Sequence, residues 1–428
     1  MRDTFLSSRT RLVAFAMGML GAAAAGATAA DELRRTALWR TARHDLRRTA
    51  RSSIVGPRTN NLRYAPRTTG SSSVPRAAAQ GPNGNVCFSN GGQLRSIDPR
   101  TGTTLWSVAA TGGRSFSAPS IGADGSIHAI QTGGNQPALI VALNVDGTQR
   151  WVHTTDEIVA DASDLAVDAS GRTFGRYLET QFTSWHAYAL DPAGSLLWKT
   201  SVPYASEFNP TAPAILRGGD LVISAIDSAW DDRLMRLDAG TGAIEWSVVP
   251  GGSLSGPVVG DNGLVLVHRP GVAGTNGVHA FDPDTGAPVW SVSYLDMEYG
   301  EDNPPVLLPG GEIVAIANGD PLGNRLVYRI SPDGVLLGTV PYPSTGYYTQ
   351  GASGGDGTIY IWTSMRLMAF SPKTGAVLFE YYAAPSSSCL KAPQATILAD
   401  GSIFASWQRK QTCNSPAAFG EFVTLSDR

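Results

Sequence analysis

Carboxylate and amide side chains are the residues of this chain best suited to hold a metal ion. Glu207 and Asn209 lie close together in one segment, and Glu301 and Asn303 lie close together in another. Oxygen atoms of such side chains bind calcium in proteins. Their spacing matches no fixed ligand pattern, so we predict no metal site and interpret the acidic segments as solvated loops. The four residues are kept as candidate cofactor ligands.

The histidines and cysteines form no assembled catalytic motif. The six histidines are scattered along the chain, without the spacing of a metal or protease motif. The three cysteines include no CxxC pair. We therefore predict no catalytic residue, and we expect a non-enzymatic protein while leaving an enzymatic role open.

Tyrosines are concentrated near the C-terminal end, and tyrosine is favoured in recognition surfaces. We predict that a protein partner binds there, and the alternative is that these side chains pack against neighbouring loops. The candidate interaction residues are Tyr342, Tyr347, Tyr348, Tyr381 and Tyr382.

Two cysteines are placed symmetrically about a predicted turn. Cys389 precedes Asp400 by eleven residues, and Cys413 follows Gly401 by twelve. A hairpin brings such near-mirror positions together, so we predict a Cys389–Cys413 disulfide. Cys87 lies in an apolar strand and is expected to be a buried free thiol, although a bridge from Cys87 to one of the other two is the alternative.

A turn ending in glycine between two apolar strands recurs along the chain. Glycine suits such hairpins because it adopts a positive φ without strain. Successive turn glycines are 41 to 48 residues apart. The glycines are Gly84, Gly125, Gly171, Gly219, Gly263, Gly311, Gly357 and Gly401.

A second signal recurs in phase with the first: an apolar strand, an Asp or Thr-Gly turn, and a strand with a large aromatic residue. The aromatic residues are Trp106, Trp151, Trp198, Trp246 and Trp290, with Gly338 and Phe379 in two divergent copies. Each period thus holds four strands, which is typical of a propeller blade. We predict an all-β fold with eight four-stranded antiparallel blades, because one blade cannot bury both of its faces alone.

The ring requires a closing strand from the N-terminal side. The last period lacks its fourth strand, whereas residues 61–66 carry Tyr64 at the position of the aromatic residue. We predict that this segment pairs with the strand near residues 422–425. We expect the tryptophans to be buried between blades, since each indole buries a large apolar area and its N–H needs an acceptor.

The string around Ala280, Asp282, Thr285, Gly286 and Trp290 resembles the tryptophan-docking motif of the PQQ-type, quinoprotein-like propeller family. The lead-in from Trp39 to Ser52 is also similar to bacterial members of that group. The resemblance implies either a quinoprotein dehydrogenase, which holds PQQ and calcium at its centre, or the cofactor-free propeller subunit of the outer-membrane β-barrel assembly machine. The compact size is closer to the second.

The N-terminus predicts export. Basic residues, an apolar run over residues 12–27 and the Ala-Thr-Ala string at residues 27–29 are typical of a cleaved signal peptide. No cysteine lies near the cleavage site, so we expect a periplasmic or extracellular protein without a lipid anchor. Residues 30–67 contain ten arginines and three acidic residues, whereas the remainder is acidic. We expect this arm to dock on its own body; binding to nucleic acid or anionic lipid is the alternative.

Together these patterns predict residues 1–29 as a signal peptide, 30–66 as a basic arm with the closing strand, and 67–428 as the propeller. The predicted function is an exported, monomeric, non-enzymatic scaffold for protein–protein interaction. We predict that it binds no cofactor and no nucleic acid and does not span a membrane. The alternative is an oxidoreductase that binds PQQ and calcium in the central channel, through residues such as Glu207, Asn209, Glu301 and Asn303.

Overall fold

The described chain consists of short β-strands connected by turns. The computed structural model describes residues 38–180, 184–202, 212–226, 232–251, 254–269, 276–294, 304–317, 325–344, 351–363, 366–383, 389–391, 393–410 and 417–427. Within these residues, no helix is long and apolar enough to cross a membrane.

Five sheets have four antiparallel strands in sequence order. The first is β3 (Ala79–Gln80), β4 (Val86–Ser89), β5 (Gln93–Asp98) and β6 (Thr103–Ala109). The second is β16 (Ala214–Ile215), β17 (Leu221–Ile226), β18 (Asp232–Leu237) and β19 (Ile244–Val248). The third is β20 (Val258–Val259), β21 (Val265–Arg269), β22 (Gly277–Phe281) and β23 (Pro288–Ser293). The fourth is β24 (Val306–Leu307), β25 (Ile313–Ala317), β26 (Leu326–Ile330) and β27 (Leu336–Pro341), and the fifth is β28 (Ala352–Ser353), β29 (Ile359–Trp362), β30 (Arg366–Phe370) and β31 (Val377–Tyr382).

Two further sheets are larger, which makes seven among the described residues. One contains β7 (Ser115–Phe116), β8 (Ser120–Ile121), β9 (Ile127–Thr132), β10 (Pro137–Leu143), β11 (Gln149–Ala162), β12 (Ala166–Val167), β13 (Thr173–Glu179), β14 (Trp185–Leu190) and β15 (Leu196–Val202). It is joined by β11, which pairs with β10 from Gln149 to Ile158 and with β13 from Val159 to Ala162. The sequence predicted separate blades here; a single long strand instead passes from one four-stranded unit into the next.

The last sheet combines both ends of the described chain. It contains β1 (Asn61–Leu62), β2 (Arg67–Thr68), β32 (Cys389–Lys391), β33 (Thr396–Ile397), β34 (Ile403–Lys410) and β35 (Ala417–Ser426). In β1, Leu62 pairs with Leu425, and in β2, Arg67 pairs with Phe422. The N-terminal segment therefore supplies the outer edge of the last sheet, as the incomplete final repeat predicted.

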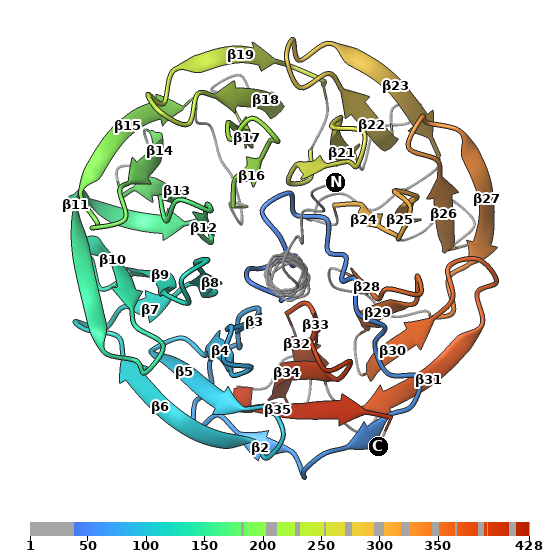
Figure 1. Cartoon of the computed structure of the whole chain (residues 1–428), viewed down its shortest axis with the longest axis horizontal. Coiled ribbons are helices and arrows are strands. Elements are labelled where there is room, and N and C mark those ends of the chain that lie inside the picture. The colour runs from blue at the N-terminus through green and yellow to red at the C-terminus, as the bar shows by residue number, and fades with distance from the viewer. Residues whose placement is uncertain are drawn as a thin grey trace, which may run out of the picture.

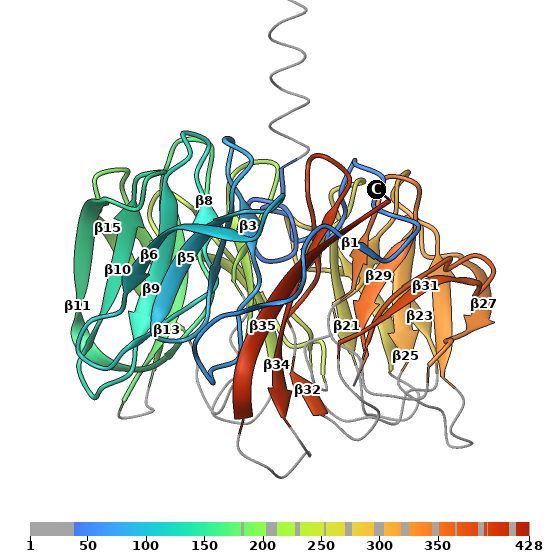
Figure 2. The same ribbon diagram turned by 90° about the horizontal axis from the view of Figure 1, so that it is seen from below.

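The sheets are arranged around a central axis (Figures 1 and 2). In the five four-stranded sheets the first strand lies innermost and the last strand outermost, whereas in the last sheet β1 and β2 lie outside β35 (Figure 1). Apolar side chains form clusters between neighbouring sheets rather than one common core. One cluster combines Phe174 and Trp198 with Met235 of the next sheet. Another combines Phe88 of β4 with Phe404 and Phe422 of the last sheet, where the ring closes.

The turn glycines explain why hairpins form at these positions. All eight glycines identified from the sequence have φ between 81° and 98°. A residue with a Cβ rarely adopts that conformation, so glycine permits the tight turn between the first two strands of each repeat. The prediction of these hairpins is confirmed.

Candidate functional site: the arm-lined axis

An N-terminal arm, residues 38–58, occupies the centre of the ring (Figure 1). Its backbone carbonyls accept hydrogen bonds from the innermost strands of successive sheets. The donor N–H groups and their distances to the arm carbonyls are Gln80 to Trp39 at 2.6 Å, Ile121 to Arg40 at 2.7 Å, Ile215 to Leu46 at 2.8 Å, Val259 to Arg47 at 2.9 Å, Leu307 to Thr49 at 3.0 Å and Ser353 to Ala50 at 2.8 Å. The arm thus pairs with amides that would otherwise face an open channel.

The backbone of the arm is unusual. Arg43, His44, Arg48 and Ala50 have φ of 64°, 76°, 60° and 55°, a left-handed conformation that is costly for residues with a Cβ. Asp45 supports this path, because its carboxylate accepts hydrogen bonds from the backbone N–H and the hydroxyl of Thr49, at 3.0 and 2.6 Å. The arm is therefore folded into one specific path and is not draped loosely over the ring.

The Asp45 carboxylate is ionised in this environment. Burial by itself would raise its pKa, but His44 and the hydrogen bonds from Thr49 outweigh burial and hold the pKa of Asp45 at about 2. His44 Nδ1 lies 3.6 Å from Asp45 Oδ2, and the His44 ring packs edge-on against Trp39 with a 4.9 Å centroid separation. The negative charge thus helps to position both the turn and the histidine.

Two side chains of the arm are fully enclosed. Trp39 and Arg43 each expose 0% of their surface. The Arg43 guanidinium donates to the carbonyls of Arg48 at 2.9 Å and Pro305 at 2.6 Å, and the Arg43 backbone N–H donates to Gln394 Oε1 at 2.9 Å. A buried guanidinium needs such acceptors, because removing it from water without them is expensive. Arg43 therefore ties the arm to two different sheets of the ring, through Pro305 before β24 and Gln394 before β33.

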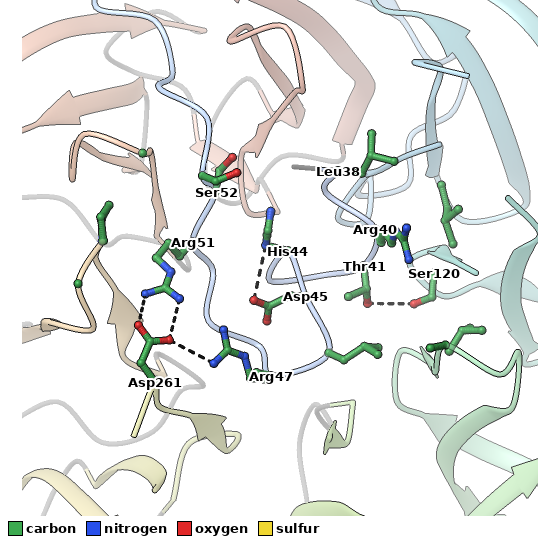
Figure 3. Close-up of a pocket in the computed structure, with 18 residues that line it drawn as sticks. Leu38, Arg40, Thr41, His44, Asp45, Arg47, Arg51, Ser52, Ser120 and Asp261 are labelled. Carbon is green, nitrogen blue, oxygen red and sulfur yellow. Dashed lines mark hydrogen bonds and ion pairs between the residues drawn. The ribbon is translucent and has the colours of Figure 1, made fainter. Parts of the chain in front are cut away.

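A cavity of about 700 Å³ lies between the arm and the turns of the ring (Figure 3). Asp261 holds two arm arginines on one side of it: Arg51 Nη1 lies 2.7 Å from Oδ2, and Arg47 Nη1 lies 3.1 Å from Oδ1. The hydrogen bond from Arg51 lowers the pKa of Asp261, and the same contact raises the pKa of Arg51. These opposite charges fasten the arm to the wall.

The hydroxyl groups on the other side of the cavity hold the arm as well. Ser120 Oγ donates to the Leu165 carbonyl at 2.5 Å and lies 3.0 Å from Thr41 Oγ1. Ser120 is thus engaged with backbone and with threonine, which is the bonding of a structural hydroxyl and not of a nucleophile activated by a base. Among the described residues, no group of three His, Cys, Asp or Glu side chains could hold a metal ion.

The five repeat tryptophans lie on the outer rim, each against a turn glycine of the next repeat unit. Trp106, Trp151, Trp198 and Trp246 donate their N–H to a carbonyl of that turn, at 3.0, 3.0, 3.0 and 2.9 Å. Trp198 is 7% exposed, whereas the other four indoles are partly exposed. We expected largely buried side chains, and none of the five is fully exposed; four keep part of their surface accessible because the outermost strand has no neighbour on its outer side.

The tyrosines predicted as an interaction surface do not form one group. Tyr342 is 5% exposed and packs against Phe370 at a 5.9 Å centroid separation, so it is a core residue and that assignment is wrong. Tyr381 is half-buried against Trp407. Tyr382 is 56% exposed, and its hydroxyl contacts Glu380 and Arg366. Tyr347 and Tyr348 lie outside the described residues.

Several other predicted positions also lie outside the described residues. They are Glu207, Asn209, Glu301, Asn303 and Cys413. Cys389 begins β32 and its Cα pairs with that of Lys410, so the Cys389–Cys413 disulfide stays a prediction. Cys87 is buried and free. Burial raises the pKa of its thiol to about 12.

The axial path of the arm was not predicted, although the arm itself was. We expected charge to dock it on the acidic body, and the Asp261 ion pairs do contribute. Six strand amides, however, bond to backbone carbonyls of the arm, and such carbonyls leave no mark in the sequence. The available signal was the lead-in from Trp39 to Ser52, a non-repeated segment rich in arginine that resembles the family.

Comparison with known proteins gives one family and one fold. The family model described as "Outer membrane protein assembly factor BamB" matches residues 23–292 and again residues 183–329. BamB from Moraxella catarrhalis has a similar solved structure, with a TM-score of 0.54 and 14% identity over 86% of this chain and 99% of that chain. No curated protein matches the sequence significantly.

Two other solved structures are less similar. One is a catalytically inactive virginiamycin B lyase from Staphylococcus aureus with quinupristin, with a TM-score of 0.46 and 14% identity over 71% of this chain and 93% of that chain. The other is a protein of unknown function from Bacteroides caccae, with a TM-score of 0.36 and 18% identity over 51% of this chain and 81% of that chain.

Proposed function

Because this chain belongs to the BamB family of PQQ-type propeller repeats, we propose that it is an exported, non-enzymatic scaffold for protein–protein interaction. The observation that carries the proposal is the arm in the axis. Trp39 and Arg43 are fully buried there, and arm carbonyls accept the inward-facing amides of successive sheets. Because the arm is fixed in the middle of the ring, the rim and the loops are the surfaces that we propose to contact other proteins.

The ring of this scaffold consists of eight blades. In support, the nine-stranded sheet divides naturally at β11, whose two halves pair with different neighbours, β10 and β13. Each half then completes a unit of four main strands like the others around the axis in Figure 1. The eight turn glycines, one in each unit, agree with that count.

The quinoprotein alternative fits the described part of the axis poorly. PQQ is a flat anionic group that such enzymes hold with calcium at the propeller centre. In this chain the arm passes through that region, and the Arg43 guanidinium is already bonded to the carbonyls of Arg48 and Pro305. A binding slot would require the arm to be displaced, at the cost of the hydrogen bonds it makes.

The proposed location is the bacterial periplasm, at the outer membrane. The family description, an outer membrane protein assembly factor, supports that setting. The sequence supports export through a signal peptide over residues 1–29. The partner is accordingly a protein of the cell envelope.

Two measurements test this proposal, the first on the purified protein that begins at residue 30 and the second on the full-length protein in cells. The protein is incubated with PQQ and calcium, and free PQQ is then removed by gel filtration. The absorption spectrum of the protein should be unchanged. A photo-crosslinking amino acid at Tyr382, which is 56% exposed, should capture a discrete envelope protein in cells. Asp146 on an exposed turn is the matched control position. Stoichiometric PQQ uptake with calcium-dependent dye reduction would overturn the scaffold role.

A further inference from the structure

The rim contains a repeated receptor for indole rings. Gly242 and Gly286 have φ of 73° and 70°, and a Cβ on either would overlap the ring of Trp198 or Trp246. The carbonyl three residues before each glycine accepts the indole N–H, at 3.0 Å in Ala239 and 2.9 Å in Pro283. A turn glycine with its upstream carbonyl is here called a docking station.

At one docking station, no aromatic ring lies against the glycine within the described residues. The turn from Ser371 to Gly375 has the same form, with φ of 73° at Gly375 and a 2.8 Å hydrogen bond from its N–H to the Ser371 carbonyl. The preceding strand, β27, carries Gly338 where its counterparts carry tryptophan. Within the described part of the chain, nothing donates a hydrogen bond to the Pro372 carbonyl.

The two strands beside this station keep the usual relationship. The carbonyl oxygen of Pro341 in β27 is the atom nearest the Cβ position of Gly375, at 3.2 Å, and Val340, two residues after Gly338, lies 3.7 Å from that position. In the filled station Val248, two residues after Trp246, approaches the Cβ position of Gly286 in the same way, at 3.0 Å. The turn and the strand beside it are thus present at both stations, but an indole lies nearest the glycine at the filled station and the Pro341 carbonyl lies nearest it at the open one.

The chain cannot readily fill the station itself. Gly338 has φ of 150°, a conformation that residues with a Cβ rarely adopt. A Cβ at this position would nevertheless meet no atom within 4 Å, so the space is open. Backbone geometry, and not lack of room, keeps this position without a side chain.

We propose that this station binds a tryptophan side chain from an extended segment of a partner protein. The filled stations of the same chain show the chemistry: an indole covers the glycine and donates to the turn carbonyl. Exposed aliphatic side chains on β27 and β31 enlarge the contact. They are Leu336, Leu337, Val377 and Leu378, each 40–48% exposed.

The charges at the open station indicate which residue should lie beside the tryptophan of the partner. At the filled station, Asp284 of the turn pairs with Arg236 of the preceding sheet at 2.8 Å. At the open station the corresponding residues are Lys373 and Arg329, and Arg329 pairs with Glu312. The exposed Lys373 has no acidic partner among the described residues. An acidic residue next to the tryptophan of the partner would therefore pair with Lys373.

The chain itself supplies a suitable probe. Residues 242–249, Gly-Ala-Ile-Glu-Trp-Ser-Val-Val, contain the strand β19 (Ile244–Val248), in which glutamate lies beside tryptophan. A fluorescein-labelled peptide of this sequence is titrated with the protein that begins at residue 30, and binding is followed by fluorescence anisotropy. The peptide should bind roughly tenfold more tightly than the same peptide with alanine in place of tryptophan, as for a central aromatic anchor.

Substitutions in the protein locate the binding. Gly375→Asn tolerates the positive φ and places a side chain in the station, so it should abolish the preference for tryptophan. Gly263→Asn is the matched control, since Gly263 has φ of 89° and no neighbour within 4 Å. Lys373→Glu, a substitution on the surface, should weaken binding of the glutamate-containing peptide several-fold. It should strengthen binding of a peptide that has lysine in place of that glutamate.

Equal binding of the tryptophan and alanine peptides, or unchanged binding to Gly375→Asn, would overturn the inference. Self-association that Gly375→Asn abolishes would also overturn it, because the occupant would then be a second copy of this chain. The inference rests on the proposed scaffold function and specifies one contact of it. If the inference about the station fails, the loops remain the proposed partner surface. Uptake of PQQ, in contrast, would overturn the proposed scaffold function itself.

Discussion

The axis and the rim of this ring are built on opposite principles. At the axis a single non-repeated segment is held by backbone hydrogen bonds, ion pairs and buried polar side chains. At the rim the same motif recurs, with an aromatic ring of one repeat unit against the turn of the next. The difference teaches that closure of the ring depends on a unique segment, whereas cohesion between neighbouring sheets depends on the repeat.

Burial differs accordingly. Trp39 at the axis is 0% exposed, whereas Leu336 at the rim is 48% exposed. Buried and hydrogen-bonded groups resist substitution, because each one removed leaves a cavity or an unsatisfied partner. Exposed aliphatic groups are available for contact with another molecule. We therefore expect substitutions at the axis to affect stability and those at the rim to affect binding.

Removing the arm should have the largest effect. A protein that begins at residue 59 loses six arm carbonyls that accept strand amides, each worth about 1 kcal/mol, and the burial of Trp39, worth roughly 3–5 kcal/mol. This sum is comparable with the whole stability of a typical protein. Gel filtration and circular dichroism should show aggregated or unfolded protein.

The control for the deletion is Arg58→Ala at the outer end of the arm. The Arg58 side chain is 66% exposed and pairs with Asp356 on the surface. Such a pair contributes little, so the variant should unfold at the temperature of the wild type. A deletion protein that stays folded and monomeric would show that the arm is dispensable for closure.

At the rim, the stability lost when a tryptophan is replaced by alanine should increase with the burial of its indole. Trp198→Ala removes a 7% exposed indole and its 3.0 Å hydrogen bond to the Ala239 carbonyl, and should cost roughly 3–5 kcal/mol. Trp290→Ala should cost at least about 1 kcal/mol less, because this indole is partly exposed and has no hydrogen-bond acceptor among the described residues. Urea unfolding measures both.

Leu337→Ala, at a 47% exposed position, is the control and should change stability by less than about 0.5 kcal/mol. Equal losses for Trp198 and Trp290 would contradict the ranking and would mean that shape, and not burial, determines the contribution of a docked indole.

The repeat made much of the rim predictable from the sequence. Spacing identified the turn glycines, the tryptophan positions and the pairing of Leu62 with Leu425 that joins the chain ends. The axis was not predictable to the same degree, because a backbone carbonyl can belong to any residue. The burial of Tyr342 was missed for a related reason: in a loop position, packing and recognition favour the same aromatic residue.

A buried histidine between axis and rim should make stability depend on pH. His128 bonds Ser126 and Thr173, and burial, the largest cause, lowers its pKa from 6.5 to about 4. The unfolded chain thus binds more protons between these values. Stability is full above pH 6.5 and falls as the pH drops towards 4, by about 2 kcal/mol between pH 7 and pH 5.

Urea unfolding at pH 7 and pH 5 measures this effect. His128→Gln keeps hydrogen-bonding atoms without a titrating group, so the variant should lose clearly less stability than the wild type over the same interval. Identical losses in the two proteins would assign the dependence to other groups.

The smallest expected effect concerns Cys87. Burial raises the pKa of this thiol to about 12, so almost no reactive thiolate exists at pH 8. In a variant with Cys389→Ser and Cys413→Ser, iodoacetamide should label Cys87 in denaturant but hardly at all in the native protein, as mass spectrometry would show. Peptide mapping of the unreduced wild type checks the Cys389–Cys413 disulfide in the same experiment, and a linkage through Cys87 would refute it.

Native-state hydrogen exchange tests the closed axis most directly. Five of the six strand amides that donate to arm carbonyls are compared: Gln80, Ile121, Ile215, Val259 and Leu307. If the arm closes the axis, these amides should exchange as slowly as Leu266 in the middle of a sheet, by unfolding of the whole ring. Rapid exchange at these five amides, while Leu266 stays protected, would show that the arm leaves the axis in solution and would contradict the account.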